Sequence, residues 1–104
     1  MNNQTIFEYV FGPESLMTLS EKLYYQNCEG IALSLDPGEA EQLQSLFESG
    51  PMCDGDTIST RIVNQLLDRK LAVKIVVEGS DGYNACTHTG AWVYRYLKHI
   101  HSVS

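Results

Sequence analysis

The chain has 104 residues, 43% of them hydrophobic, and three cysteines. This size predicts one domain with a single core, and an odd number of cysteines without paired spacing argues against a secreted disulfide framework. The apolar runs are far shorter than the roughly 20 residues of a membrane helix, and the first four residues lack the basic start of a signal peptide. We therefore expect residues 1–104 to form one cytoplasmic domain without a membrane partner.

The charges are distributed unevenly along the chain. The formal net charge of -6 argues against nucleic acid as a partner, because contacts to phosphate require Lys and Arg. Ten acidic residues and only one basic residue, Lys22, precede Thr57. The other basic residues follow it: Arg61, Arg69, Lys70, Lys74, Arg95 and Lys98. This asymmetry indicates either a basic working face on an acidic body or a solvated surface with chance clustering.

The first 30 or so residues predict a helical extension. Apolar residues within Ile6–Phe11 recur at helical spacing until Gly12 interrupts them, which predicts a short helix. Pro13 suits the first position of a second helix, which we expect to close at Gly30. The predicted buried face of that helix consists of Leu16, Leu19 and Leu23. The alternation over Ile31–Leu35 then predicts a short strand, a third member of a small sheet.

The next segment has strong helix signals at both ends. Asp36 suits the N-cap, Pro37 the first turn, and Glu39 the acidic position of a capping box. Gly50 and Pro51 end this helix. Its predicted buried face consists of Ala40, Leu43, Leu46 and Phe47.

A further amphipathic helix follows the acidic loop-like segment Met52–Asp56. Asp56 or Thr57 suits its N-cap, and we expect Arg69 and Lys70 in its last turn, where basic charge complements the helix dipole. Its predicted core-facing stripe consists of Ile58, Ile62, Val63, Leu66 and Leu67.

The hydrophobic period changes to two after Leu71. Val73, Ile75 and Val77 fall on one side of a predicted strand, and Lys74 and Glu78 on the other. The remaining elements are a hairpin tip at residues 79–82, a return strand with Tyr83, Ala85 and Thr87, and a last helix opened by Thr87-His88-Thr89-Gly90. In the last helix, Val93, Tyr94, Leu97 and Ile100 face the core or a partner.

Three stretches together resemble bacterial winged helix-turn-helix regulators of the MarR and PadR type. Residues 58–77 look like the recognition helix and first wing strand, residues 87–90 are similar to the Leu-Thr-x-x-Gly motif that caps the helix after the wing, and residues 35–40 resemble the start of the first core helix. The resemblance covers about residues 35–97. It implies an α+β, winged-helix-like fold, mostly helical with a small antiparallel β-hairpin wing.

One feature departs from that family pattern. The families place a whole short helix before the recognition helix, to brace it against phosphates. Here only Pro51–Asp56 stands between the two predicted helices. We expect a loop or a single turn in its place.

The resemblance implies a small, non-enzymatic, DNA-binding transcriptional regulator that acts as a homodimer. Arg, Asn and Gln are the side chains that pair with base edges in the major groove, and Lys and Arg contact phosphates. The candidate DNA-contacting residues are Thr60, Arg61, Asn64 and Gln65 on the reading helix, Lys74 on the hairpin, and Arg95 and Lys98 on the last helix. The alternative for these residues is an ordinary solvated surface.

A second hypothesis is a winged-helix-like adaptor or inhibitor that binds a protein and no DNA, with its acidic N-terminal half against a basic partner. A continuous positive face joining Arg61, Lys74 and Lys98 favours DNA, whereas an acidic collar around the reading helix favours protein. Aromatic residues in the second and last predicted helices suit either a core or an interface. They are Tyr24, Tyr25, Trp92, Tyr94 and Tyr96.

Enzyme and metal signatures are weak. The chain has no Gly-x-Ser-x-Gly and no phosphate loop, and its carboxylates lack a spacing that suggests acid and base work. The pairs Cys86/His88 and His99/His101 lack zinc-finger spacing, and residues 54–56 are too short for a calcium loop. We expect no enzymatic activity, no metal and no cofactor.

Overall fold

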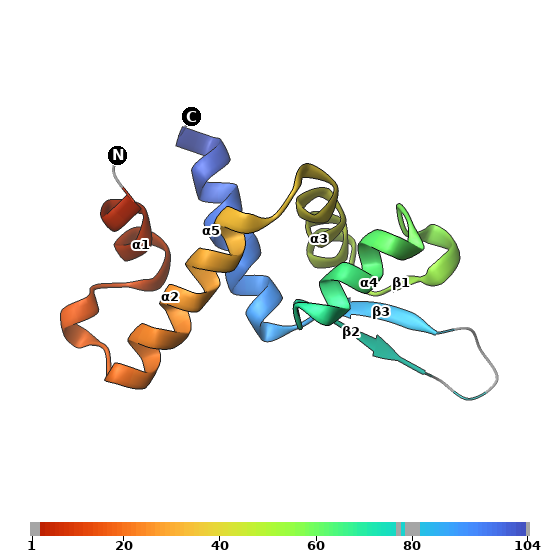
Figure 1. Ribbon diagram of the computed structural model, residues 1–104, viewed down its shortest axis with the longest axis horizontal. Helices are drawn as coiled ribbons and strands as arrows, with labels where there is room; N and C mark the ends of the chain where they lie inside the picture. The colour runs from red at the N-terminus through yellow and green to blue at the C-terminus, as the bar shows by residue number, and fades with distance from the viewer. Residues whose placement is uncertain (1–2, 77, 79–81, 104) are drawn as a thin grey trace.

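The computed structural model describes residues 3–76, 78 and 82–103, and the side chains of residues 5–76, 78 and 82–101. Its elements in chain order are α1 (Asn3–Phe11), the 3₁₀ turn η1 (Glu14–Leu16), α2 (Leu19–Ser34), α3 (Pro37–Ser49), β1 (Met52–Cys53), the 3₁₀ turn η2 (Asp54–Asp56), α4 (Thr60–Asp68), β2 (Ala72–Ile75), β3 (Tyr83–Cys86) and α5 (His88–Val103) (Figure 1). The predicted fold class, α+β and mostly helical with a small antiparallel sheet, is confirmed.

The three strands form one antiparallel sheet in the order β1-β3-β2. Met52 of β1 pairs with Asn84 of β3, and Ile75 of β2 pairs with Tyr83. A core helix, a short strand, a turn, a second helix and a hairpin thus follow one another as in a winged helix. The hairpin extends away from α1 and α2 (Figure 1). Of its predicted tip, only Gly82 lies within the described residues, and Val77 lies outside them.

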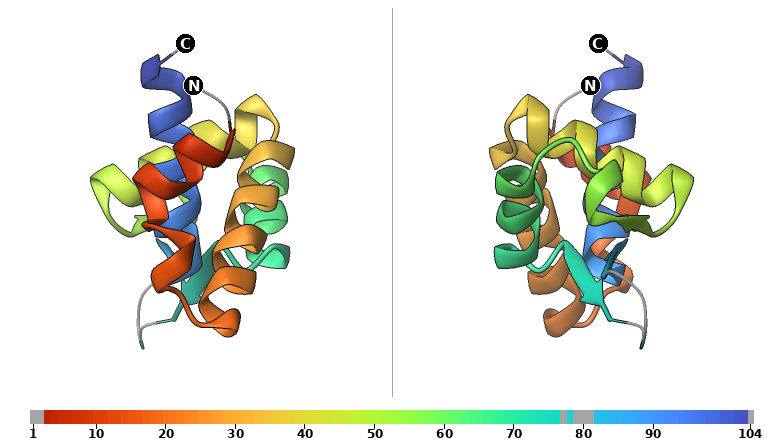
Figure 2. Two further views of the ribbon diagram at one scale, coloured as in Figure 1. Left: turned by 90° about the vertical axis from the view of Figure 1, so that its left-hand side faces the viewer. Right: turned by 90° about the vertical axis from the view of Figure 1, so that its right-hand side faces the viewer.

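The long helix α5 packs against α1, α2 and α3. The two side views show it alongside these helices, with the sheet at one end of the molecule (Figure 2). Phe11 of α1 lies at the centre of an aromatic cluster, with its ring centroid 4.9 Å from that of Tyr25, 5.5 Å from that of Trp92 and 5.9 Å from that of Tyr96. These aromatic residues therefore belong to the core.

The predicted strand at Ile31–Leu35 is wrong, because α2 continues as a helix to Ser34. Pro13 also does not begin this helix. It precedes η1, and α2 starts after Thr18, whose hydroxyl oxygen accepts a hydrogen bond from the Glu21 backbone N–H in a capping box. The predicted end of this helix at Gly30 is also wrong. α2 packs along α5, and this packing contributes more to stability than the roughly 1 kcal/mol that one glycine costs in helix propensity.

The predicted buried face of α2 is also wrong. Leu16, Leu19 and Leu23 are exposed, and the side of α2 that faces the core carries Cys28 and Ala32 instead. Tyr24 and Tyr25 pack partly against the same core. Because α2 is apolar on two sides, helical spacing alone did not tell which side the protein buries.

The ends of α3 are as predicted, and those of α4 differ. Asp36 caps α3 in a capping box with Glu39, and Gly50 ends it with a positive φ of 81°. The N-cap of α4 is Ser59, so the predicted caps at residues 56 and 57 are wrong and Ile58 is exposed before the helix. Since α4 ends at Asp68, Arg69 and Lys70 lie beyond its last turn.

The start of α5 follows the predicted motif and depends on a glycine. The hydroxyl oxygen of Thr87 accepts a hydrogen bond from the Gly90 backbone N–H at 3.0 Å. A Cβ at Gly90 would overlap the Leu71 carbonyl oxygen and lie 2.8 Å from the sulfur of Cys86. Only glycine therefore allows α5 to pass this close to the chain that enters β2.

We predict that Gly90→Ala lowers the free energy of unfolding by about 3 kcal/mol, because the methyl group would collide with backbone. Gly30→Ala is the matched control. It adds the same group on α2, where nothing lies within 4 Å, and should raise stability by about 0.5–1 kcal/mol. Urea denaturation of both variants measures the difference, and equal stability of the two would contradict the close approach at Gly90.

Candidate functional site

The candidate reading helix α4 is held by its buried side chains Ile62, Val63 and Leu66. Its partner α3 approaches closely at Gly38, where a Cβ would lie 2.9 Å from the Ile62 Cδ1 atom. On the other side of α4 the structure brings together most of the predicted contact residues. Thr60, Arg61 and Asn64 are exposed there and Gln65 is half-buried.

The expected loop or single turn in place of the missing helix is present as β1 and η2. Gln42 of α3 is fully buried and anchors the residues that lead into α4. Its side-chain oxygen accepts a hydrogen bond from the Ile58 backbone N–H at 2.7 Å, and its Nε2 atom lies 3.7 Å from the Met52 sulfur. One amide side chain thus binds both ends of the shortened segment, a role that helical periodicity did not reveal.

A second polar network joins η2 to the hairpin. The Asp54 carboxylate accepts hydrogen bonds from the Asn84 side-chain amide at 2.8 Å and from the Lys74 ammonium group at 3.2 Å. These donors lower the pKa of the Asp54 carboxyl, the Asn84 amide most. Lys74, a predicted phosphate contact, is therefore engaged within the protein.

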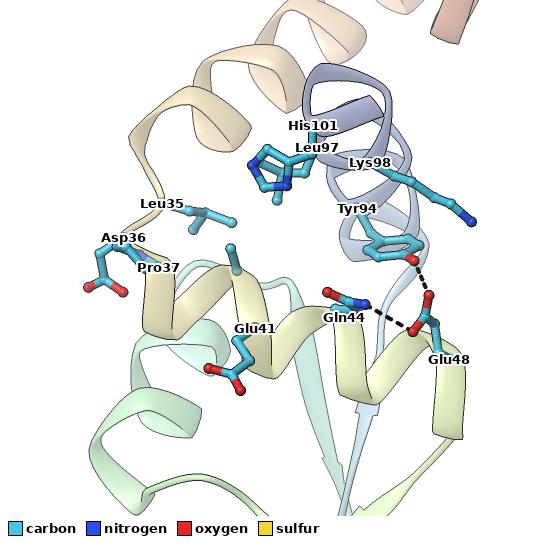
Figure 3. Close-up of a pocket in the computed structure, with 11 residues that line it drawn as sticks. Leu35, Asp36, Pro37, Glu41, Gln44, Glu48, Tyr94, Leu97, Lys98 and His101 are labelled. Atoms are coloured by element: carbon cyan, nitrogen blue, oxygen red, sulfur yellow. Dashed lines mark hydrogen bonds between the residues drawn. The ribbon is translucent and has the colours of Figure 1, made fainter. Parts of the chain in front are cut away.

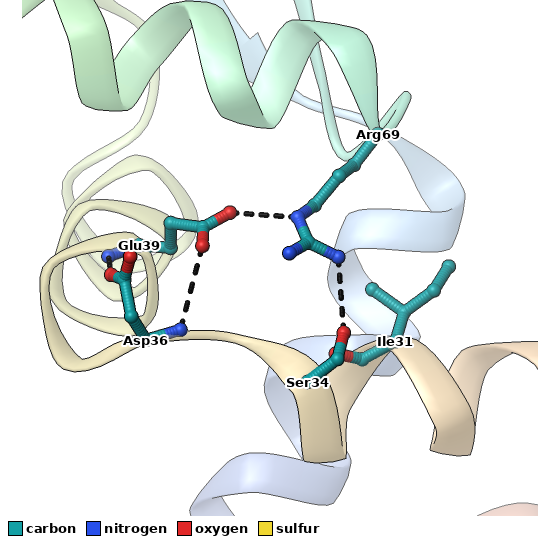
Figure 4. Close-up of polar contacts among 5 residues, drawn as sticks. All are labelled: Ile31, Ser34, Asp36, Glu39 and Arg69. Carbon is teal, nitrogen blue, oxygen red and sulfur yellow. Dashed lines mark hydrogen bonds and ion pairs between the residues drawn. The ribbon is translucent and has the colours of Figure 1, made fainter.

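Polar contacts connect the end of α2, the start of α3 and the end of α4 (Figure 4). Glu39 at the start of α3 is only 4% exposed, and its carboxylate accepts a hydrogen bond from the Arg69 guanidinium group at 2.7 Å. Arg69 also donates to the hydroxyl oxygen of Ser34 at the end of α2, at 3.0 Å. The Asp36 backbone N–H approaches the same carboxylate at 3.4 Å. Arg69 thus holds α4 to α2 and α3.

The predicted contact residues on α5 do not extend the α4 surface. Lys98 lines a cavity of about 520 Å³ between α3 and α5, together with Glu41, Gln44 and Glu48 from α3 (Figure 3). The Arg95 guanidinium group lies 4.8 Å from the centre of the Trp92 ring. Since α5 packs against α1, α2 and α3, the structure divides the predicted residues among separate surfaces.

Part of the wall of this cavity consists of polar side chains that are hydrogen-bonded to one another. The Tyr94 hydroxyl donates to the Glu48 carboxylate at 2.5 Å, and the Gln44 amide donates to it at 3.1 Å (Figure 3). Burial, followed by this contact with Glu48, raises the pKa of Tyr94 to about 12. The Tyr94 hydroxyl lowers the pKa of Glu48, with smaller contributions from Gln44 and Lys98. Lys98 therefore lies in an acidic setting.

The outer face of the sheet is apolar, which the alternation did not predict. Ala72 and Asn84 face inward and are buried. Val73, Ile75 and Tyr83 lie on the opposite face and are 38% to 47% exposed, and Ile75 pairs with Tyr83 across the hairpin. The predicted alternation after Leu71 is correct, but the larger side chains lie on the solvent-exposed face of the sheet and the smaller ones on the buried face.

Within the described part of the chain, no group of three His, Cys, Asp or Glu side chains is arranged to hold a metal ion. Among the same residues, no helix combines the length and the apolar character that crossing a membrane requires. A scan against protein-family models, a search of curated proteins and a search of solved structures each find no match to this chain.

Gln42→Met should lower the free energy of unfolding by about 1–2 kcal/mol, because the Ile58 N–H would lose its acceptor while the volume stays similar. The Ile58 amide should also exchange its hydrogen faster. Gln44→Met on the exposed side of α3 is the control and should change stability by less than about 0.5 kcal/mol. Unchanged exchange at Ile58 in Gln42→Met would contradict the anchoring role of Gln42.

Attachment of η2 to the hairpin should weaken in acid. The folded-state pKa of Asp54 lies below its ordinary value of 3.8, so its contribution is present above that pH and disappears as the pH falls through the lowered value. NMR signals of the Asn84 side-chain amide should follow this titration. In Asp54→Asn the acid-induced change should be absent, and an identical change in that variant would assign it to another group.

Proposed function

We propose that this winged-helix-like domain is a protein-interaction module that binds a partner through the outer face of its sheet. The supporting observation is the exposed apolar pairing of Ile75 with Tyr83 on a wing whose lysine is engaged by Asp54. A wing that contacts phosphate needs available positive charge. An apolar wing face instead suits the desolvated centre of a protein interface.

The distribution of charges also favours a protein partner over DNA. Three of the six basic residues that follow Thr57 have an acidic neighbour: Arg69 with Glu39, Lys74 with Asp54, and Lys98 with Glu48. The turn η2 places Asp54 and Asp56 shortly before the N-terminus of α4. Two of the three basic residues that a positive face would need, Lys74 and Lys98, thus lie beside acidic groups, and acidic residues also precede α4.

The partner's chemistry follows from the borders of this face. Cys53 of β1 pairs with Tyr83, and its thiol lies 3.0 Å from the Asp56 carboxylate, so an acidic group stands at the β1 edge. Glu78 is exposed in the connection that follows β2. A protein segment with apolar side chains between basic ones complements this arrangement.

DNA binding by a small homodimeric regulator is the second candidate, because Arg61 and Asn64 are both exposed and lie three residues apart on one side of α4. Both side-chain types read base edges. Binding of duplex DNA at low salt that weakens steeply with added salt, and that Arg61→Ala removes without unfolding the protein, would support this candidate over the first.

The test of the first candidate is a photoreactive phenylalanine analogue at Tyr83, introduced in cells that make the protein. We expect one major cross-linked partner, identifiable by mass spectrometry. The purified partner should bind Ile75→Asp at least about tenfold more weakly, since one charge would enter a desolvated contact. Leu16→Asp adds the same charge at an exposed leucine of η1 and should bind normally.

The analogue at Tyr9, an exposed residue of α1, is the control for chance capture. The same adduct from Tyr9 and Tyr83, or normal binding of the partner by Ile75→Asp, would overturn the proposal.

A further inference from the structure

The outward side of α2 carries an exposed apolar stripe. Leu19, Leu23 and Leu33 are 72%, 57% and 56% exposed. Together with Gln26 and Gly30 they recur after four, three, four and three residues, so the five positions share one side of the helix. α5 passes behind α2 in Figure 1, and the stripe lies on the side of α2 away from the core residues.

This stripe makes α2 apolar on two opposite sides. The inner side is buried through Cys28 and Ala32, while the outer side has the leucines that a surface helix normally replaces with charged residues. Its five positions carry no charge, in a chain with net charge -6. A helix of this pattern is normally covered on both sides, so the outer side has the character of an interface.

The stripe is complementary to itself in the antiparallel direction. Leu19 and Leu33 each lie seven residues from Gln26, and Leu23 and Gly30 lie three and four residues from it. A second α2 running the other way would place Leu19 of one copy against Leu33 of the other. Leu23 would then meet Gly30, where nothing lies within 4 Å of an added Cβ. Self-complementarity of this kind is what a two-fold interface requires.

The flanking charges select the same direction. Lys22 and Glu29 lie on one flank of the stripe, four residues before and three residues after Gln26. Like flanks face each other in an antiparallel pair, so Lys22 of each copy would approach Glu29 of the other. A parallel pair would instead turn unlike flanks toward each other, so Lys22 and Glu29 would face the uncharged flank of the other copy and form no ion pair with it.

The opposite flank adds no repulsion. It consists of Ser20, Asn27 and Ser34, which are uncharged. Lys22 also lies 3.6 Å from Glu14, and the Glu29 carboxylate accepts a hydrogen bond from the Tyr96 hydroxyl at 2.7 Å, so both side chains are already oriented by contacts within the protein.

We propose that the occupant of this surface is a second copy of the chain, docked antiparallel through α2 with the two-fold axis beside Gln26. The interface uses the outer side of α2, and the aromatic residues remain in the core. It is separate from the wing face and does not depend on the proposed partner binding there.

The first experiment is sedimentation equilibrium of the intact protein over a wide concentration range. We expect a reversible monomer–dimer equilibrium, and Leu23→Asp should raise its dissociation constant at least about tenfold, because a charge would enter the apolar contact. Val76→Asp adds the same charge to an exposed aliphatic residue beside the wing and should leave dimerisation unchanged.

The second experiment tests the direction of pairing with single cysteines and a short bifunctional maleimide, in a Cys53→Ser, Cys86→Ala background; the remaining Cys28 is fully buried. Gln26→Cys should give a cross-linked dimer. Leu19→Cys alone should not, because antiparallel pairing separates the two Leu19 positions by about 21 Å along the helix. A mixture of Leu19→Cys and Leu33→Cys chains should cross-link again.

Three results would overturn this inference. One is a monomer at the highest concentration reached. The others are a dimer as stable in Leu23→Asp as in the original chain, and efficient cross-linking of Leu19→Cys to itself. Each leaves the proposed function untouched, because that depends on Ile75 and Tyr83.

Discussion

The buried carboxylate of Glu39 is the contact on which the arrangement of the helices depends. A carboxylate removed from water is costly unless it is paired, and Arg69 supplies the pairing charge from the end of α4. Because Arg69 also reaches Ser34 at the end of α2, the N-terminal extension and the winged-helix part share one polar junction. Burial of one acidic group thus connects the end of α4 to the start of α3.

Polar side chains also hold the short segment between α3 and α4, which has η2 where the regulators that the sequence resembles have a whole helix. Gln42 binds the backbone before α4 from one side, and Asp54 binds Asn84 and Lys74 from the other. This arrangement holds η2 in place with few residues. Its consequence is that the lysine of the wing is paired with Asp54, so less positive charge is available for a nucleic acid.

Local signals in the sequence predicted the parts of the structure that local chemistry determines, such as the Asp36 cap and the turn at residues 87–90. They did not predict which side of a helix or strand is buried, because that depends on contacts between residues distant in the sequence. Helical spacing around Leu23 and alternation around Ile75 gave the correct periods in both cases, but the protein buries the smaller side chains of those elements. The sequence also did not predict which basic residues have acidic neighbours, because their partners Glu39, Asp54 and Glu48 lie 20 to 50 residues away in the chain.

The salt dependence of the affinity distinguishes DNA binding from dimerisation through α2. DNA binding releases counterions and weakens as salt is added. Two copies that each carry a net charge of -6 repel one another, and the stripe between them on α2 is neutral, so salt screens mainly repulsion. The contacts between Lys22 and Glu29 weaken on screening, but they are exposed and individually small. Association through α2 should therefore strengthen as salt rises, the opposite sign to DNA binding.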